Sequence, residues 1–534
     1  MKSHRLLILL FVLFLVAAGA FYFYQNYTAT GNEAGTILLA KKERAVEKEN
    51  VIIGVSRLPT GIYPNIEAEF FEANYSSHIF ETLAAFNREG RVIPSLAIKW
   101  DNPNDLTWRF YLSPKAQFSN GTPVTAEDVK FSYDYLANSQ LPIKEGLPAV
   151  DQINVIDKKT IEFKTKSKDP LFLNHLAVGM FKVMSKQEVE KNGTKNYIGS
   201  GPYKLVEWNE QNLKLTRNEN YWGPKPKIKN VTFKLYPKEE DKITALLNKE
   251  VDFISYGYAS SEYLAKIDQA AKNKEIQKKR MPDPNIVYLD LDTLRDKSPY
   301  IKSDNNPLKD VRVRQAMYLA INIKEAISNS KLDLEPANQL VSQGIFGYNP
   351  KITRPAYNLE KAKSLMKEAG FGDGFEIKID YLKDPRSEPF FQEIFNQLAS
   401  INIKVTPNPL EDKQYFEKIA ASDSSAYITA WSADSLDAGE VLENLLHTKT
   451  EQYGLYNLGY SNSEVDKLIE EVGKTLDEKS RKQKLQEAMK IAMDEVAKIP
   501  LLQNFNKYAF ATDISWQPRL DGAIKAYEMA GKAQ

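Results

Sequence analysis

The sequence contains no cysteine in its 534 residues. This absence excludes disulfides, thiolate metal sites, cysteine nucleophiles and a lipid-modified N-terminal cysteine. A chain of this length can bury enough apolar surface to be stable without covalent cross-links. It is too long for a single core, however, and we therefore expect two or more domains.

Histidine is also scarce, with four in the chain: His4, His78, His175 and His447. No two of them have the i, i+4 spacing of a zinc-binding helix, and no Gly-x-Ser-x-Gly nucleophile motif occurs. The glycine-rich stretch 370–374 follows a predicted helix and precedes a predicted strand, which is the reverse of a phosphate-binding loop. We therefore predict no enzyme activity, no catalytic residues, no bound metal and no cofactor.

An excess of charge of either sign is missing as well. The chain carries 71 Lys and Arg residues against 70 Asp and Glu residues, so its net charge is +1 at pH 7. A nucleic-acid-binding protein would show a basic excess, and none is present. The composition therefore predicts no nucleic-acid partner.

One long apolar run is present, and it lies at the N-terminus. Leu6–Tyr24 is unbroken in apolar character and follows the basic residues Lys2 and Arg5, which is the pattern of an export signal. Its nineteen residues approach the roughly 20 that cross a bilayer as a helix. Residues 1–24 are thus a signal peptide or a membrane anchor, and residues 25–50 are a polar tether.

Two interpretations of the N-terminal segment remain open. Ala18–Ala20 fits the small-x-small pattern that signal peptidase cleaves, which would release a soluble periplasmic protein. The aromatic residues Phe21–Tyr24 suit a membrane interface and favour an uncleaved anchor in the cytoplasmic membrane. In both cases the basic residues stay inside, so the chain from Val51 onward lies outside the cytoplasm.

The first part of the body mixes strands and helices. Val51–Val55 is a short apolar run typical of a buried strand, and 106–112 alternates as a half-buried strand does. Thr125 with Asp128 predicts a capped helix start, and the helix should continue to about Leu136.

Later segments alternate more regularly. Asn358 should cap a helix that ends at Gly370, and the alternation at 375–381 predicts a strand. A helical stretch at 391–398 and a strand at 401–405 complete a strand–helix–strand unit, which favours a parallel pair. Two further helices should start at Ser463, as a cap, and near Asp477. The predicted class is α/β.

Several separated stretches occur in an order that is typical of one protein family. The most recognisable reads FSNGTPVTAEDV at 118–129. The others lie at 93–97 with 99–100, 199–203, 218–222, 310–316, 460–466 and 499–501. Together they resemble the peptide/nickel-binding class, family 5, of extracellular solute-binding proteins of ABC importers, which includes the oligopeptide- and dipeptide-binding proteins.

This resemblance implies a two-lobe periplasmic-binding-protein type II fold with an extra inserted domain. Domain I would consist of 51–93, 201–288 and 503–534, domain II of 94–200, and domain III of 289–502. The chain would cross between the lobes twice, which makes a hinge. A ligand that contacts both lobes would favour the closed state through its differential affinity.

The resemblance also points to one stretch as the ligand site. Thr429–Asp434 leads a predicted strand to a Trp and then to a carboxylate, and in peptide-binding relatives the Trp-x-x-Asp carboxylate holds the ligand's α-amino group. It implies that Asp434 is the amine anchor. The cleft walls beside it would be Trp431, Ser432 and Ala433, and those on the facing lobe would be Ser56, Arg57 and Leu58. The alternative is that Trp431 is a core residue and that Asp434 caps a turn.

One departure from the family pattern concerns the ligand's carboxylate. Oligopeptide-binding relatives carry basic residues shortly before this Trp, whereas Ile419–Ala430 contains no Lys or Arg, and the usual Asp-Pro is Asp437-Ala438 here. Arg354 or Arg386 could serve instead.

The implied function is capture of a peptide-like ligand and its delivery to an ABC permease in the inner membrane by a monomeric protein. A metal chelate or an oligosaccharide as the ligand, or a role as a membrane-tethered ligand sensor, remain alternatives.

Overall fold

The structure is a computed structural model that describes residues 48–63, 74–139, 147–179, 181–257, 259–330 and 333–532. The predicted export segment Leu6–Tyr24 and residues 25–47 of the predicted tether lie outside the described residues. None of the described helices combines the length and apolar character that a membrane crossing requires.

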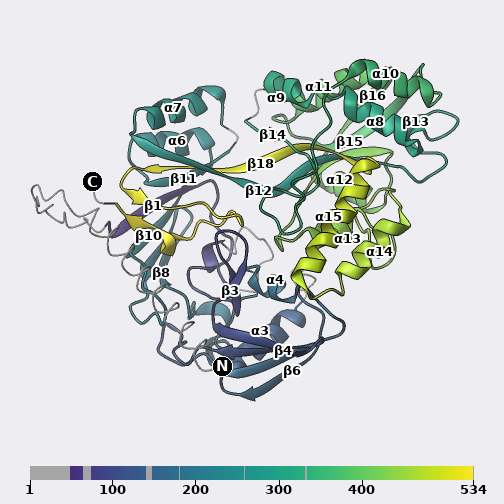
Figure 1. Cartoon of the computed structure of the whole chain (residues 1–534). Helices are drawn as coiled ribbons and strands as arrows, with labels where there is room; N and C mark the ends of the chain where they lie inside the picture. Colours follow the sequence, from purple (N-terminus) through teal and green to yellow (C-terminus); the bar gives the residue numbers. More distant parts are fainter. Residues whose placement is uncertain are drawn as a thin grey trace, which may run out of the picture. The chain divides into compact units, whose positions relative to one another are not determined.

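A twelve-stranded mixed sheet runs through the described chain (Figure 1). Its strands follow the order β13-β15-β17-β12-β18-β11-β1-β10-β9-β8, with β14 beside β18 and β16 beside β15. We call residues 48–275 with 512–532 lobe one and residues 292–497 lobe two, because β12 (Ile276–Leu291) and β18 (Lys498–Ala511) pass between these two parts.

Lobe one holds one half of the large sheet. Its strands and covering helices are β1 (Asn50–Val55), β8 (Tyr203–Trp208), β9 (Asn212–Arg217), β10 (Asn230–Leu235), β11 (Phe253–Tyr256), α6 (Glu239–Leu247) and α7 (Ser261–Lys272). β1 is parallel to both β10 and β11. The apolar run that predicted the first strand is confirmed, and its residues Val51 and Ile53 are buried in the lobe-one core.

A separate four-stranded antiparallel sheet belongs to lobe one, in the order β4-β5-β7-β6. Its elements are β4 (Ala97–Asn104), β5 (Thr107–Leu112), β6 (Val150–Asp157), β7 (Thr160–Thr165), α3 (Ala126–Ala137), α4 (Phe172–Ala177), α5 (Lys186–Asn192) and η2 (Gly193–Lys195). The capping box at Thr125 and Asp128 is confirmed, because each side chain accepts a hydrogen bond from the backbone of the other. This sheet has its own core around Phe110 and Phe163.

Short elements complete lobe one: β2 (Ala84–Phe86), β3 (Val92–Pro94), β19 (Ile514–Ser515), η4 (Ala526–Glu528) and β20 (Ala530–Gly531). Phe86 of β2, Ala177 of α4 and the next residue, Val178, belong to the same buried core as the lobe-two helices. The lobes are therefore in apolar contact beside the crossing strands.

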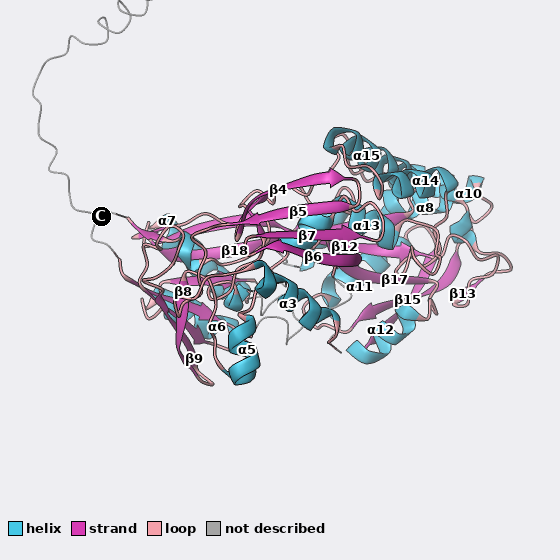
Figure 2. Ribbon diagram, turned by 90° about the horizontal axis from the view of Figure 1, so that it is seen from below, coloured by secondary structure: helices cyan, strands magenta, loops and turns pink. Residues whose placement is uncertain are grey.

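Lobe two holds the other half of the large sheet. Its elements are β13 (Ile301–Lys302), η3 (Pro307–Lys309), α8 (Val311–Ala320), α9 (Ile323–Ser330), β14 (Glu335–Pro336), α10 (Leu359–Glu368), β15 (Phe375–Leu382), α11 (Glu388–Ala399), β16 (Ile403–Leu410), α12 (Asp412–Ala420), β17 (Ala426–Ser432), α13 (Ala438–Leu445), α14 (Ser463–Val472) and α15 (Glu478–Asp494). Seen from below in Figure 2, the helices α8, α10 and α14 lie at the opposite end from β8 and β9.

The predicted strand–helix–strand unit is confirmed, because β15 and β16 pair in parallel and α11 connects them. Asn358 caps α10, as predicted, and α15 begins next to Asp477, where a helix start was expected; Asp477 is its cap. The predicted cap at Ser463 is wrong: Asn462 is the cap, and its side-chain oxygen accepts from the backbone of Glu464 and Val465. Ser463 is already the first helical residue, so its own amide belongs to the turn that needs capping.

The two crossing strands form the longest ladder of the fold (Figure 1). They pair antiparallel from Ile276 opposite Ala511 to Asp290 opposite Lys498, with register shifts between Pro282 and Ile286 and after Val287. The expected crossing points near Leu289 and Leu502 fall inside these strands. The α/β class is confirmed, whereas the exact domain boundaries remain a prediction.

Candidate functional site

The end of β17 positions the predicted amine anchor. β17 pairs antiparallel with β12, which places Trp431 opposite Ile286 and Ser432 opposite Asn285. After Ser432 the chain leaves the ladder, and the Ser432 hydroxyl donates a hydrogen bond of 2.6 Å to Oδ1 of Asp434. Asp434 therefore lies just beyond the end of β17, and its carboxylate already accepts a hydrogen bond from Ser432.

Asp434 lines a cavity of about 410 Å³ between the two lobes. Burial raises the pKa of Asp434, and the hydrogen bond from Ser432 offsets only part of this rise. Among the described residues no Lys or Arg forms an ion pair with Asp434. A carboxylate withdrawn from water without a cationic partner favours a positively charged group entering the same space.

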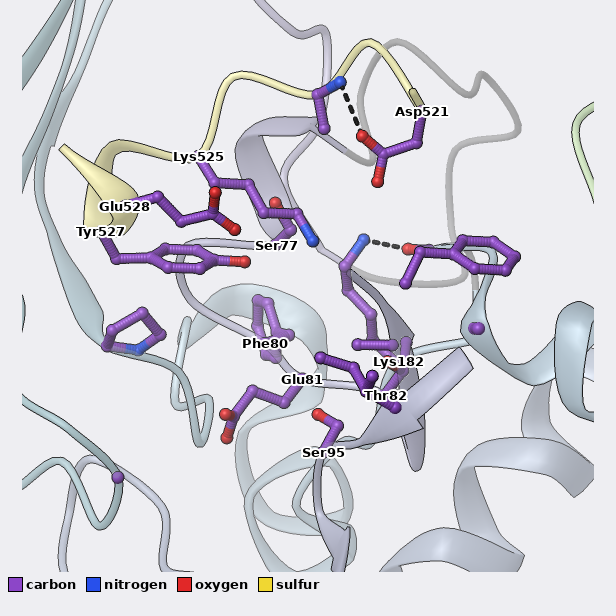
Figure 3. Close-up of a pocket in the computed structure, with 18 of the residues that line it drawn as sticks. Ser77, Phe80, Glu81, Thr82, Ser95, Lys182, Asp521, Lys525, Tyr527 and Glu528 are labelled. Atoms are coloured by element: carbon purple, nitrogen blue, oxygen red, sulfur yellow. Dashed lines mark hydrogen bonds between the residues drawn. The ribbon is translucent and has the colours of Figure 1, made fainter. Parts of the chain in front are cut away.

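The rest of the cavity wall comes from lobe one, as Figure 3 shows. The carboxylate of Glu81 accepts hydrogen bonds from the hydroxyl of Tyr221 at 2.8 Å and from the indole nitrogen of Trp222 at 2.9 Å. Burial nevertheless raises the pKa of Glu81 to about 7. Two lysines, Lys182 and Lys525, line the same cavity.

A second cavity of about 780 Å³ also has walls from both lobes. Ser56 lines it, and its hydroxyl accepts a hydrogen bond of 2.7 Å from the ammonium group of Lys242. Asp283 lines it too; burial and the nearby charge of Asp434 raise the pKa of Asp283. Asp283 therefore borders the larger cavity and is close enough to Asp434, which lines the smaller one, for their charges to interact.

The structure brings only part of the predicted site together. Trp431, Ser432 and Ala433 line neither of these two cavities. The ring of Trp431 packs against Tyr456 at 4.9 Å between centroids and borders the lobe-two helical core, while Ala433 is fully buried. Trp431 thus makes the contacts of a packing residue, although its buried indole nitrogen has no hydrogen-bond partner among the described residues.

In the predicted stretch on the facing lobe, residues 56–58, only one of the three side chains borders a described cavity. Ser56 borders the larger cavity, whereas the backbone carbonyl of Arg57 accepts a hydrogen bond from Tyr75 and Leu58 packs against the lobe-one core. This stretch and Asp434 do not line the same one of the two cavities.

The two arginines considered for the ligand's carboxylate differ in their surroundings. Arg354 donates to the backbone carbonyl of Pro500 and lies 4.6 Å over the ring of Tyr318, so it holds lobe two together. Arg386 lines the larger cavity and pairs with Asp384.

Sequence reasoning missed Glu81, Lys182 and Lys525. They come from three distant parts of the chain, and no local motif distinguishes them from the many other charged residues. Among the described residues no group of three or more His, Asp or Glu side chains is placed to hold a metal ion.

Comparison with known proteins identifies the family. The sequence model described as bacterial extracellular solute-binding proteins, family 5 middle, matches residues 91–453. The dipeptide-binding protein of Escherichia coli K12 is 25% identical over 440 residues, covering 76% of this chain and 79% of its own. The periplasmic oligopeptide-binding protein OppA of Salmonella typhimurium is 27% identical over 459 residues, covering 77% and 79%.

Solved structures agree with the sequence comparison on the fold. The structure of HbpA2 from Haemophilus parasuis superimposes with a TM-score of 0.81 at 21% identity, over 90% of this chain and all of that one. This match confirms the predicted two-lobe type II fold. Because the family model covers more than half of the sequence, the chain belongs to the bacterial extracellular solute-binding proteins of family 5.

Proposed function

We propose that this protein captures a short peptide between its two lobes, outside the cytoplasm, and delivers it to an ABC permease in the cytoplasmic membrane. The observation that carries this proposal is Asp434, a largely buried carboxylate that lines the interlobe cavity and has no cationic partner among the described residues. Two of the relatives are named as binders of dipeptides and oligopeptides.

The geometry suits a ligand with a free α-amino group. An ammonium group in the cavity would supply the positive charge that Asp434 lacks, and charge-assisted hydrogen bonds of this kind are among the stronger ones. Because Asp434 comes from lobe two and most of the wall from lobe one, a bound peptide would contact both lobes. Closure would then follow from the ligand's greater affinity for the closed state.

The proposal extends to the protein's place in the cell. The protein would act as a monomer, either released after cleavage or tethered by Leu6–Tyr24. The binding role requires no bond to be made or broken, which agrees with the relatives being binding proteins.

A binding experiment with Asp434→Asn tests the proposal. Trialanine should bind the wild-type protein, and the variant should lose about 100-fold in affinity because a buried charge pair loses one partner. N-acetyl-trialanine, which has no ammonium group, should bind both proteins weakly and equally. Asp304→Asn, on a surface loop, is the matched control and should bind like the wild type.

Native mass spectrometry of protein purified without denaturation gives an independent readout. Co-purifying masses of short peptides, absent from Asp434→Asn, would support the proposal. A sugar or metal-chelate mass, or equal peptide affinity of the variant and the wild type, would contradict it.

A further inference from the structure

A contact between helices α4 and α13 joins the two lobes beside the cavity that Asp434 lines. The side-chain amide of Asn174 in α4 donates a hydrogen bond to the carbonyl of Ser435. The backbone amide and the hydroxyl of Ser435 in turn donate to the carboxylate of Glu440 in α13, at 3.0 and 2.7 Å. Because α4 belongs to lobe one and α13 to lobe two, these hydrogen bonds connect the lobes.

Apolar packing surrounds this contact. Ala177 at the end of α4 and the next residue, Val178, share one buried core with Leu442 and Leu445 of α13. Ala177 and Val178 also line the cavity of Asp434. Charged groups at this place are therefore partly withdrawn from water while the lobes touch.

A histidine of lobe one lies among carboxylates of both lobes. His175 follows Asn174 in α4, is half-buried, and has its Nδ1 3.8 Å from Oδ2 of Asp169, which precedes the helix. From lobe two, Glu440 and Glu443 of α13 are close enough for their charges to interact with His175. Two of the three carboxylates that face the histidine thus come from the opposite lobe.

Negative charge is in excess in the whole cluster. Arg481 of α15 faces Glu443, but it is already paired with Asp437. Tyr453 faces Glu443 as well and stays neutral near pH 7, because burial raises its pKa. The interacting cations are His175 and Arg481, and the carboxylates are Asp169, Asp434, Asp437, Glu440 and Glu443.

The contact raises the proton affinity of its central groups. Burial raises the pKa of Glu443 to about 7, and Arg481 offsets only part of this rise. Burial also raises the pKa of Glu440, in spite of the hydrogen bonds from Ser435. Burial lowers the pKa of His175, but the carboxylates around it outweigh burial, so that this pKa is raised too. Bringing the lobes together therefore takes up protons.

We propose that His175 of α4 with Glu440 and Glu443 of α13 forms a proton-sensitive contact, which holds the lobes together at mildly acidic pH and releases them as the pH rises past neutrality. Such a contact acts on lobe closure whatever the ligand is, and it therefore goes beyond the proposed capture of a peptide.

The direction of the pH effect follows from the raised pKa values. A group whose pKa is raised in the contact stabilises it fully below the group's ordinary pKa, which is 4.5 for Glu443 and 6.5 for His175. This stabilisation is lost as the pH rises through the raised value, which is about 7 for Glu443. At higher pH the half-buried carboxylates face a neutral histidine, and the contact is weakest.

The absence of cysteine allows the lobe contact to be measured directly. Lys158, in the turn between β6 and β7, and Glu487, on α15, are exposed and lie on different lobes, so Lys158→Cys with Glu487→Cys accepts a pair of dyes. Single-molecule energy transfer on the ligand-free protein then counts molecules with the lobes together and apart. The ratio of together to apart should fall about 10-fold or more from about pH 5.5 to about pH 8.5, because one pKa unit corresponds to a tenfold change.

Three substitutions in the labelled protein assign the effect. Glu443→Gln keeps the shape of the side chain without its titration; it should lose most of the pH dependence, and its lobes should stay together at about pH 8.5. His175→Gln, on the other lobe, should lower the ratio at about pH 5.5, because it removes the cation. Glu417→Gln, in an exposed pair with Lys413 on α12, is the matched control and should follow the wild type.

Calorimetry of trialanine binding gives a second measurement. Titrations in two buffers with different heats of ionisation report the protons taken up on binding. At about pH 6.5 the wild type should take up roughly 0.5 proton more than Glu443→Gln. Glu81 and Asp434, which line the cavity, contribute to both proteins and cancel in this difference.

The two measurements decide the proposal separately from peptide capture. A ratio that does not change with pH, or a ratio in Glu443→Gln that falls as steeply as in the wild type, would show that the contact is not proton-sensitive. Equal proton uptake by the two proteins on binding trialanine would contradict the proposal as well. The dye measurement uses no ligand, so its result holds even if trialanine does not bind.

Discussion

Lys498 of β18 and Asp290 of β12 face each other in register and form an ion pair in which neither side chain is exposed to solvent. The ammonium group also lies 5.6 Å from the centroid of the Tyr288 ring. Both strands pass between the lobes, so the pair joins the two crossing segments at their lobe-two end. A one-residue slip of either strand would leave two buried charges unpaired, and the pair therefore fixes the register of the crossing.

Replacing Asp290 should destabilise the protein strongly. Asp290→Ala leaves the ammonium group of Lys498 buried without its partner, which should cost about 3–5 kcal/mol in the free energy of unfolding. Urea denaturation followed by circular dichroism measures the effect. Asp494→Ala removes an equivalent carboxylate from the exposed pair with Lys490 and should leave the stability nearly unchanged. Similar values for the two variants would contradict the assigned role.

The start of α13 depends on a second buried carboxylate. Asp437 caps α13 by accepting a hydrogen bond of 2.7 Å from the amide of Gly439, and it also holds the buried guanidinium group of Arg481 from α15. Asp437→Ala should lower the free energy of unfolding by about 3–5 kcal/mol, because it removes both the cap and the buried pair. Asp477→Ala removes only an exposed cap of α15 and should cost about 1 kcal/mol. Equal losses would show that the pair with Arg481 contributes nothing.

A hydrogen bond joins α4 of lobe one to lobe two. The side-chain amide of Asn174 in α4 donates to the carbonyl of Ser435 at 2.8 Å. Asn174→Ala removes this contact between the lobes and should weaken trialanine binding by about 5- to 10-fold, the equivalent of one hydrogen bond. Asn192→Ala, which loses a bond within its own helix, is the control and should bind like the wild type. Unchanged affinity of Asn174→Ala would show that this contact does not govern closure.

Local sequence patterns were sufficient to predict many of the helices and strands. The capping box at Thr125, the cap at Asn358 and the alternation at 375–381 each depend on residues within one turn or one strand, and the structure confirms them. The cap at Asn462 was misplaced by one residue, because Asn462 and Ser463 are both good caps and only the backbone conformation distinguishes them.

The candidate site was only partly predictable. Asp434 follows a strand with a recognisable local sequence, so a family resemblance could point to it. Lys182 and Lys525 have no local signature, because nothing in their neighbourhoods indicates that the fold brings them to one cavity. For Trp431, which its motif predicted as a cleft wall, the structure shows packing against Tyr456, and its role in the cleft stays a prediction.

The sequence by itself determined the absence of thiol chemistry, the α/β class and the family, and through the family resemblance it pointed to the carboxylate of Asp434 as a candidate anchor. Helix caps, strand alternation and family motifs are local or collinear, so they can be recognised without coordinates. Only the tertiary structure decided which charges share the cavity and which pair, such as Asp290 with Lys498, fixes the crossing strands. Those relationships join residues hundreds of positions apart, and their energies depend on burial that only the folded chain creates.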